Sequence, residues 1–202
     1  AWTFSGLTFG DGSGAATTTA SGTGGITISG TLSVANNQGL DAGSKTWTLS
    51  GSGAPLSVGG GFTGNTSTFT YTSSSGTDVS ALSSRAMTGS YAFYNLTING
   101  TDAFTTSVDV TVSNDLTITA GTLDGTNNIT VSGGDVTGSG TVNLGSGTFT
   151  LTGGGLLGGS SDWVFSSLTL GSGTDNATTT ATGTGLASVT GTLTVSDRHG
   201  LD

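Results

Sequence analysis

The sequence predicts an all-β fold, a parallel β-solenoid of roughly ten stacked coils with open ends. Three observations predict it: helix signals are almost absent, short segments alternate apolar and polar residues, and the chain repeats itself. The chain contains no Glu and one Met, and its apolar residues never keep a helical spacing over a long stretch. The fold class is therefore set by strands.

Each expected strand is short and has an apolar residue on either side of a Thr or Ser. Ile26-Thr27-Ile28, Trp47-Thr48-Leu49 and Leu116-Thr117-Ile118 are examples, and Gly, Ser, Asn or Asp bound them. Side chains alternate between the two sides of a strand, so we expect the apolar pair inside and the Thr outside. The other expected strands are residues 32–34, 69–71, 96–98, 108–112, 129–131, 149–151, 168–170 and 193–195.

A long internal repeat organises these strands. Residues 2–41 match residues 163–202 without a gap, at a constant shift of 161 and with 22 identities in 40 positions. We interpret residues 1–202 as one continuous solenoid segment, in which a repeat of residues 1–161 is followed by the start of a second copy at 162–202.

Shorter sub-repeats, about 1–89 and 90–161, lie within the long one. Each begins with an aromatic residue, a Phe two positions later and a Leu three positions after that, and the motif recurs at the start of the second copy. We expect these nine residues to anchor the core: Trp2, Phe4, Leu7, Tyr91, Phe93, Leu96, Trp163, Phe165 and Leu168.

Tandem Ig-like β-sandwich domains are the alternative fold. Sandwiches usually have longer strands, bulky cores and polar linkers between domains, and no linker composition occurs in this chain. A solenoid has a thin interior that small residues fill, which fits a composition of 38 Gly, 42 Thr and 29 Ser among 202 residues. The irregular stretch 72–89, with Arg85 and Met87, is expected to be a longer loop or an excursion at a sheet edge.

Composition argues against several functions. A net charge of −9 without a basic cluster argues against nucleic acid and anionic membrane surfaces as partners. No apolar run is long enough to cross a bilayer, so we expect no membrane insertion. There is no Cys, hence no disulfide and no thiolate metal site.

No catalytic, cofactor-binding or metal-binding residues are assigned, and we expect no enzyme. The single histidine, His199, aligns with Gln38 in the first copy and is interpreted as a variable turn residue. Lys45, Arg85 and Arg198 are scattered, whereas catalysis needs ionisable groups that converge. The aspartates are expected to cap tight turns: Asp41, Asp124 and Asp202 share a repeat position but lie about four coils apart, too far to share one ion.

Three further features have specific interpretations. Triple glycines at 59–61 and 153–155 are expected at corners with positive φ. Trp2, Trp47 and Trp163 are assigned to core packing in preference to sugar platforms. Thr-x-Thr pairs could order water and bind ice if they lined up, but the pairs, which begin at Thr46, Thr68, Thr117, Thr148 and Thr192, are unevenly spaced along the chain. That spacing predicts no regular array on one face.

Several segments resemble the repeats of large prokaryotic surface proteins with β-helical stalks, the filamentous-haemagglutinin-like and autotransporter-passenger adhesins. Residues 93–100, 115–124 and 145–153 carry this resemblance. It is one of composition and repetition over nearly the whole chain. It implies a secreted or cell-surface location and brings no catalytic residues with it.

These observations lead to an expected function. We expect a structural subunit or segment of an extracellular filament or adhesin stalk, which assembles with itself head to tail because neither end shows a polar cap. The alternative is an adhesin module that binds a glycan or another surface ligand, and a less favoured one is an ice-binding protein.

Overall fold

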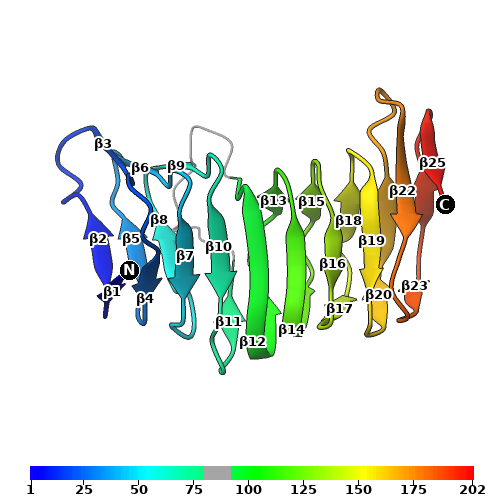
Figure 1. The fold of residues 1–202 in the computed structure, drawn as a ribbon, viewed down its shortest axis with the longest axis horizontal. Helices are drawn as coiled ribbons and strands as arrows, with labels where there is room; N and C mark the ends of the chain where they lie inside the picture. The colour runs from blue at the N-terminus through cyan, green and yellow to red at the C-terminus, as the bar shows by residue number, and fades with distance from the viewer. Residues whose placement is uncertain (80–91) are drawn as a thin grey trace.

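The computed structural model describes residues 1–79 and 92–202, which wind into an elongated β-solenoid of about nine turns (Figure 1). Every pairing of strands in these residues is parallel, and none of them is in a helix. The solenoid is thus confirmed and the sandwich is not found. The turns number about nine rather than ten because their length varies: the turn from Leu96 to its partner Leu116 is short, whereas the turn from Thr68 to its partner Asn95 is longer.

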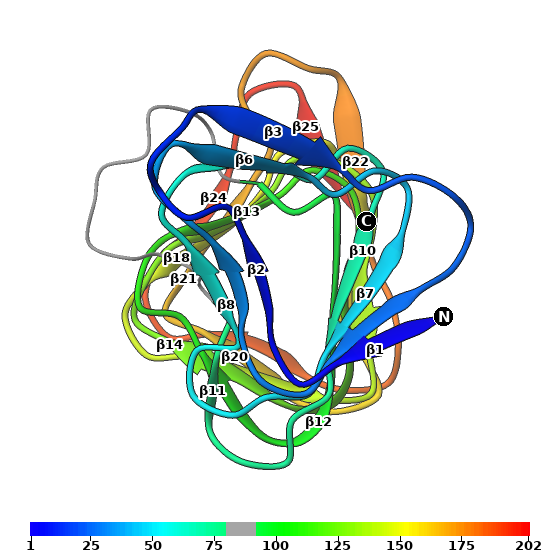
Figure 2. The ribbon, with the colours of Figure 1, turned by 90° about the vertical axis from the view of Figure 1, so that its left-hand side faces the viewer.

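The winding has three faces, which Figure 2 shows along the axis. We call the first face A, and it runs the full length of the molecule as one parallel sheet. Its strands are β1 (Trp2–Phe4), β4 (Ile26–Ile28), β7 (Thr46–Leu49), β10 (Thr68–Tyr71), the first parts of β12 (Asn95–Thr105) and β14 (Leu116–Gly125), β16 (Val136–Gly138), β19 (Gly155–Gly159), β22 (Ala177–Ala181) and β25 (His199–Leu201).

Face B follows face A along the chain. Strands β12 and β14 bend around the corner between the two faces, and the register shifts after Ile98 mark that bend. The bridge between Gly53 and Thr77 joins the early and late parts of face B. Its strands are β2 (Leu7–Phe9), β5 (Leu32–Val34), β8 (Leu56–Val58), β11 (Thr77–Asp78), the second parts of β12 and β14, β17 (Thr141–Leu144), β20 (Trp163–Phe165) and β23 (Ala187–Val189).

Face C completes each turn. Phe93 connects its two parts, because its ring lies 6.0 Å from that of Phe62 and its backbone bridges to Val112. The strands are β3 (Ala16–Thr19), β6 (Gln38–Asp41), β9 (Gly61–Thr63), β13 (Val110–Val112), β15 (Ile129–Val131), β18 (Thr148–Leu151), β21 (Ser167–Leu170) and β24 (Leu193–Val195).

Corresponding strands of the two repeat copies pair in the same way but lie on different faces of the solenoid. Trp2 pairs with Ile26 and Trp163 with Ala187, at the same separation along the chain, and the following strands match in the same way. Along face A, β19 is the seventh strand after β1. The strand that follows β19 in the chain is β20, the repeat of β1, and it lies on face B. The second copy is therefore turned by one face relative to the first.

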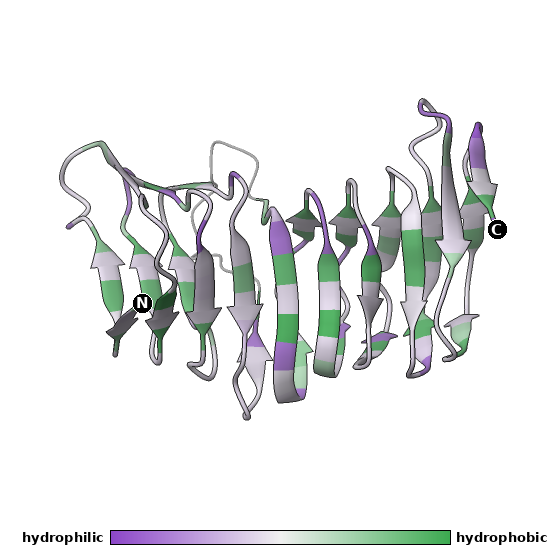
Figure 3. Ribbon diagram, viewed as in Figure 1, coloured by the Kyte–Doolittle hydropathy of each residue, from purple (hydrophilic) through white to green (hydrophobic). Residues whose placement is uncertain are grey.

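Alternation along the strands builds the core. Ile28, Leu49, Ile98 and Ile118 are fully buried, while the residues between such apolar pairs face outward, and Figure 3 shows this banding on the ribbon. Because neighbouring strands pair in register, like residues stack on like, as Ile98 does on Ile118. The core is thus a column of apolar layers, one per turn.

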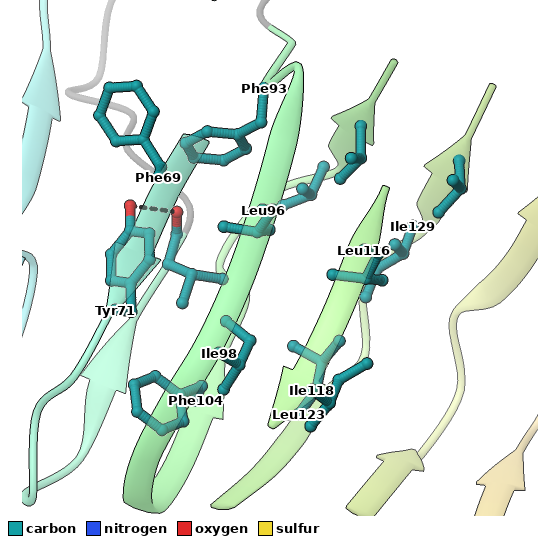
Figure 4. Packing of buried hydrophobic residues seen from close by; sticks show 14 of the residues in the cluster. Phe69, Tyr71, Phe93, Leu96, Ile98, Phe104, Leu116, Ile118, Leu123 and Ile129 are labelled. Carbon is teal, nitrogen blue, oxygen red and sulfur yellow. Dashed lines mark hydrogen bonds between the residues drawn. The ribbon is translucent and has the colours of Figure 1, made fainter. Parts of the chain in front are cut away.

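Aromatic rings thicken this column in its first half. Trp47 and Phe69 stack with centroids 5.7 Å apart, and Phe69 lies 5.4 Å from Phe93 (Figure 4). Tyr71 is fully buried beside them, and its hydroxyl donates a hydrogen bond to the Val79 carbonyl at 3.1 Å. Burial, followed by the charge of Asp78, raises the pKa of Tyr71 well above its ordinary value.

The first glycine triplet, residues 59–61, does not have the positive φ that was predicted for it. Gly154 and Gly155 do have positive φ, 78° and 118°, but residues 59–61 do not. At Gly60 a Cβ would lie 2.0 Å from the Gln38 carbonyl oxygen of the preceding coil. Glycine is required there because two stacked corners approach closely.

The long loop expected over residues 72–89 is described only in part. Thr77 and Asp78 form β11, so at least this section is a strand. Arg85, Met87 and the predicted anchor Tyr91 lie outside the described residues.

Tyr71 should make stability fall in alkali. Its pKa is raised in the fold, so the stabilisation by the neutral phenol is complete below the unfolded-state pKa of about 10 and is lost as pH rises towards the folded-state value. Tyr71→Phe should lower the free energy of unfolding by about 1 kcal/mol at neutral pH. It should also flatten the alkaline decline measured by denaturant unfolding. Tyr94→Phe, at a half-buried tyrosine, is the control; parallel alkaline curves for Tyr71→Phe and the unsubstituted chain would contradict the assignment.

Candidate functional site

The two ends of the solenoid are the candidate site. Of the six large apolar residues that are exposed in the described chain, five lie at the ends, and the sixth, Leu156, lies on β19. At the N-terminal end Trp2 is 69% exposed and borders an apolar hollow of about 410 Å³. The other apolar side chains that line the hollow are Phe4, Leu7, Phe9, Ala20, Ile26 and Trp47.

The C-terminal end presents apolar side chains instead of a hollow. Leu186, Leu193, Val195 and Leu201 are 64%, 49%, 42% and 49% exposed, and they belong to the last turn, formed by β23, β24 and β25. In the described residues these three strands have a paired neighbour on one side only, as do β1, β2 and β3. Both ends therefore combine apolar surface with free backbone hydrogen-bonding groups, the features of an edge that pairs with another strand.

The repeat shows that this exposure comes from position. Trp2 and Trp163 sit in the same local geometry, each 6.3 Å from its Phe partner with rings at 78° and 81°. Trp163 is nevertheless only 1% exposed, and its indole donates to the Gly140 carbonyl at 2.9 Å in the turn before it. Trp2, predicted as a buried anchor, is exposed in this structure, where no described turn precedes it.

The C-terminal end gives the same comparison. Leu193, Val195 and Leu201 correspond to Leu32, Val34 and Leu40, which are 0%, 2% and 1% exposed. Those residues of the first copy are covered by the turn of β7, β8 and β9. The exposed end positions thus correspond to core positions of the first copy, and no described turn lies beyond them.

The remaining predicted anchors divide by their distance from the N-terminal end. Phe4 and Leu7 are partly buried and pack against the core cluster. The anchors inside the solenoid are buried: Phe93, Leu96, Trp163, Phe165 and Leu168.

Threonines on the outer surface form rows that the sequence reasoning missed. In face A, seven central threonines pair from strand to strand, and in face C another five do so. The prediction of no regular array is wrong. It counted only Thr-x-Thr pairs, whereas a row needs a single Thr at the centre of each three-residue strand segment. The face A row is Thr3, Thr27, Thr48, Thr70, Thr97, Thr117 and Thr137, and the face C row is Thr111, Thr130, Thr150, Thr169 and Thr194.

The aspartates act at corners, as predicted. Asp115 accepts a hydrogen bond from the backbone N–H of Asp135 at 2.9 Å, and Asp135 accepts one from the N–H of Leu156 at 2.9 Å. Asp41, the last residue of β6, accepts from the N–H of Gly43, and Asp124, near the end of β14, accepts from the N–H of Gly125. Carboxylates thus link one corner to the next along the axis.

His199 is a strand residue rather than the expected turn residue. It begins β25, is 9% exposed, and its Nε2 lies 2.8 Å from the Thr179 hydroxyl. Its counterpart Gln38 also uses its side chain across the stack, donating to the Gly14 carbonyl. In the part of the chain that the structure describes, no three His, Cys, Asp or Glu side chains come together.

The tryptophans give little support to a sugar platform. Trp47 and Trp163 are buried, which leaves Trp2 as the one ring among the exposed large apolar residues of the described chain. Residues 1–79 and 92–202 contain no helix with the length and apolarity needed to cross a bilayer.

Comparison of the chain with protein-family models, with curated proteins and with solved structures finds no match.

The repeated tryptophans offer a matched pair for testing the role of the ends. Trp163→Ala should lower the free energy of unfolding by about 3–5 kcal/mol, because it empties a filled core site. Trp2→Ala, at the same repeat position, should cost less than about 1 kcal/mol in dilute solution. Urea denaturation at low protein concentration measures both, and equal losses would show that Trp2 is already covered.

Proposed function

We propose that this chain is a structural segment of an extracellular or cell-surface filament or adhesin stalk, and that each of its end turns stacks on another turn. One observation carries the proposal: residues exposed at the ends occupy positions whose repeat partners are buried under a neighbouring turn. Burying Trp2, Leu193, Val195 and Leu201 in the same way would remove several large apolar surfaces from water.

Backbone pairing supports the same function. Each described turn is bound to the next by parallel ladders on its faces, so hydrogen bonds run along the axis from β1 to β25. A rod built in this way transmits tension through many bonds per layer, and its length grows by adding turns. A structural role needs only this geometry and no reactive side chain.

The proposed location follows from composition and resemblance. A composition rich in Thr, Ser and Gly, a net charge of −9 and the absence of Cys are compatible with a protein outside the cell. The turns also have the style of the β-helical stalks of prokaryotic surface proteins, and this likeness supports a stalk or fibre over a compact binding module.

End-to-end assembly should produce uniform fibres whose length increases with protein concentration, visible by negative-stain electron microscopy. Leu193→Asp should abolish them, because it places a charge in the buried junction. Leu156→Asp is the matched control, since Leu156 is 38% exposed but lies on the side of the solenoid. A chain that stays monomeric at high concentration, or equal behaviour of the two variants, would count against stacking at the ends.

Ice binding is a second candidate, favoured by the threonine row of face A. The row covers seven successive strands at a spacing of about 4.8 Å and gives each a hydroxyl and a methyl group on a parallel sheet. On β7 and β10 the flanking outward residues are also uncharged: Thr46, Ser50, Thr68 and Thr72. Such a surface can hold water in a regular array.

If this candidate is correct, the chain should show thermal hysteresis. Thr70→Tyr should abolish that hysteresis by interrupting the row, whereas Ser57→Tyr, at the corresponding position of β8 on face B, should leave it unchanged. The measurement is the gap between melting and freezing points of a single ice crystal, and its absence in the unsubstituted chain would reject ice binding.

A further inference from the structure

We infer that the C-terminal turn binds the N-terminal turn of a second copy with β1 on β23, β2 on β24 and β3 on β25. Each copy would then be turned by one face relative to the copy before it. The inference rests on the proposed function and specifies the junction that this function needs. Its source is the way in which the repeat is wound inside the chain.

Side-chain alternation sets the register of the junction. Within the chain, triplets pair centre to centre, as Thr3 does with Thr27 and Val164 with Ser188. A slip by one residue would turn the apolar side chains outward. Thr3 of the second copy should therefore lie beside Ser188 of the first, with Trp2 over Ala187 and Phe4 over Val189.

The direction of winding sets the face. Strand β25 ends on face A, and in this solenoid the strand after one on face A lies on face B. Inside the chain β19 leads in this way to β20, the repeat of β1, through residues 160–162 only. Placing β1 on β23 continues the same path, so that the end of β25 and the start of β1 lie next to each other.

The shapes of the two ends agree with this placement. Ala187 is small and already has Trp163 as its partner on the other side, so a second indole, that of Trp2, can cover it. Leu7 and Phe9, which line the N-terminal hollow, would meet the exposed Leu193 and Val195 of β24. An unturned junction, with β1 on β25, would instead set the apolar indole of Trp2 against the polar ring of His199, whose Nε2 lies 2.8 Å from the Thr179 hydroxyl.

Cysteine crosslinking tests the junction in a chain that has no cysteine of its own. Neighbouring strands lie about 4.8 Å apart, within the Cα separation that a disulfide accepts. The double variant Thr3→Cys/Ser188→Cys should give a ladder of covalent multimers under mild oxidation. Thr3→Cys/Gly200→Cys reports an unturned junction and Thr3→Cys/Thr194→Cys one turned by two faces, and both should remain near the level of the single-cysteine variants.

The outcomes separate the inference from the proposed function. A ladder from the Thr3/Ser188 pair alone supports the turned junction. Fibres of the cysteine-free chain together with a ladder from the Gly200 or Thr194 pair would overturn the turned junction and leave the structural function in place. Absence of both fibres and ladders, in variants whose circular dichroism shows an intact fold, would overturn both.

Discussion

The structure depends on one constraint, the in-register stacking of short parallel strands. Each triplet presents an apolar, a polar and again an apolar residue, and it must lie over a triplet of the same phase or its core residues would face water. Backbone hydrogen bonds then hold turns together along the axis, and Asp and Asn side chains repeat this linkage at the corners. With this constraint met, the cross-section can be filled by one layer of side chains per turn.

Variation is accommodated at the corners, where the strands do not need to pair. Turns differ in length, as the steps from Leu96 to Leu116 and from Thr68 to Asn95 show, yet the triplets remain aligned. Close approach of successive corners demands glycine at places such as Gly60, whereas bulky rings pack against one another inside the core in both halves of the solenoid. Among the described residues the end turns have a neighbouring turn on one side only, which explains why identical residues differ in exposure between the two copies.

Much of the fold could be predicted from the sequence, because alternation in short runs has few interpretations once helix signals are missing. The core positions of Phe93, Trp163 and Phe165 follow from the same alternation. The number of turns, about nine, is close to the roughly ten predicted, and the difference arises because loop residues change the turn length without changing the pattern. The threonine rows were also missed, because rows depend on which strands become neighbours, and the exposure of Trp2 depends on what lies beside the first turn.

A repeat that advances by seven turns and one further face distributes its features around the axis. The loop between β2 and β3 and its counterpart between β21 and β22 mark different corners of the rod. In a series of such repeats, a given loop would lie at a different corner in each of three successive copies and would return to the first corner in the fourth. A fibre of this kind has no single side that is stiffer or more decorated than the others, so it would resist bending equally in every direction.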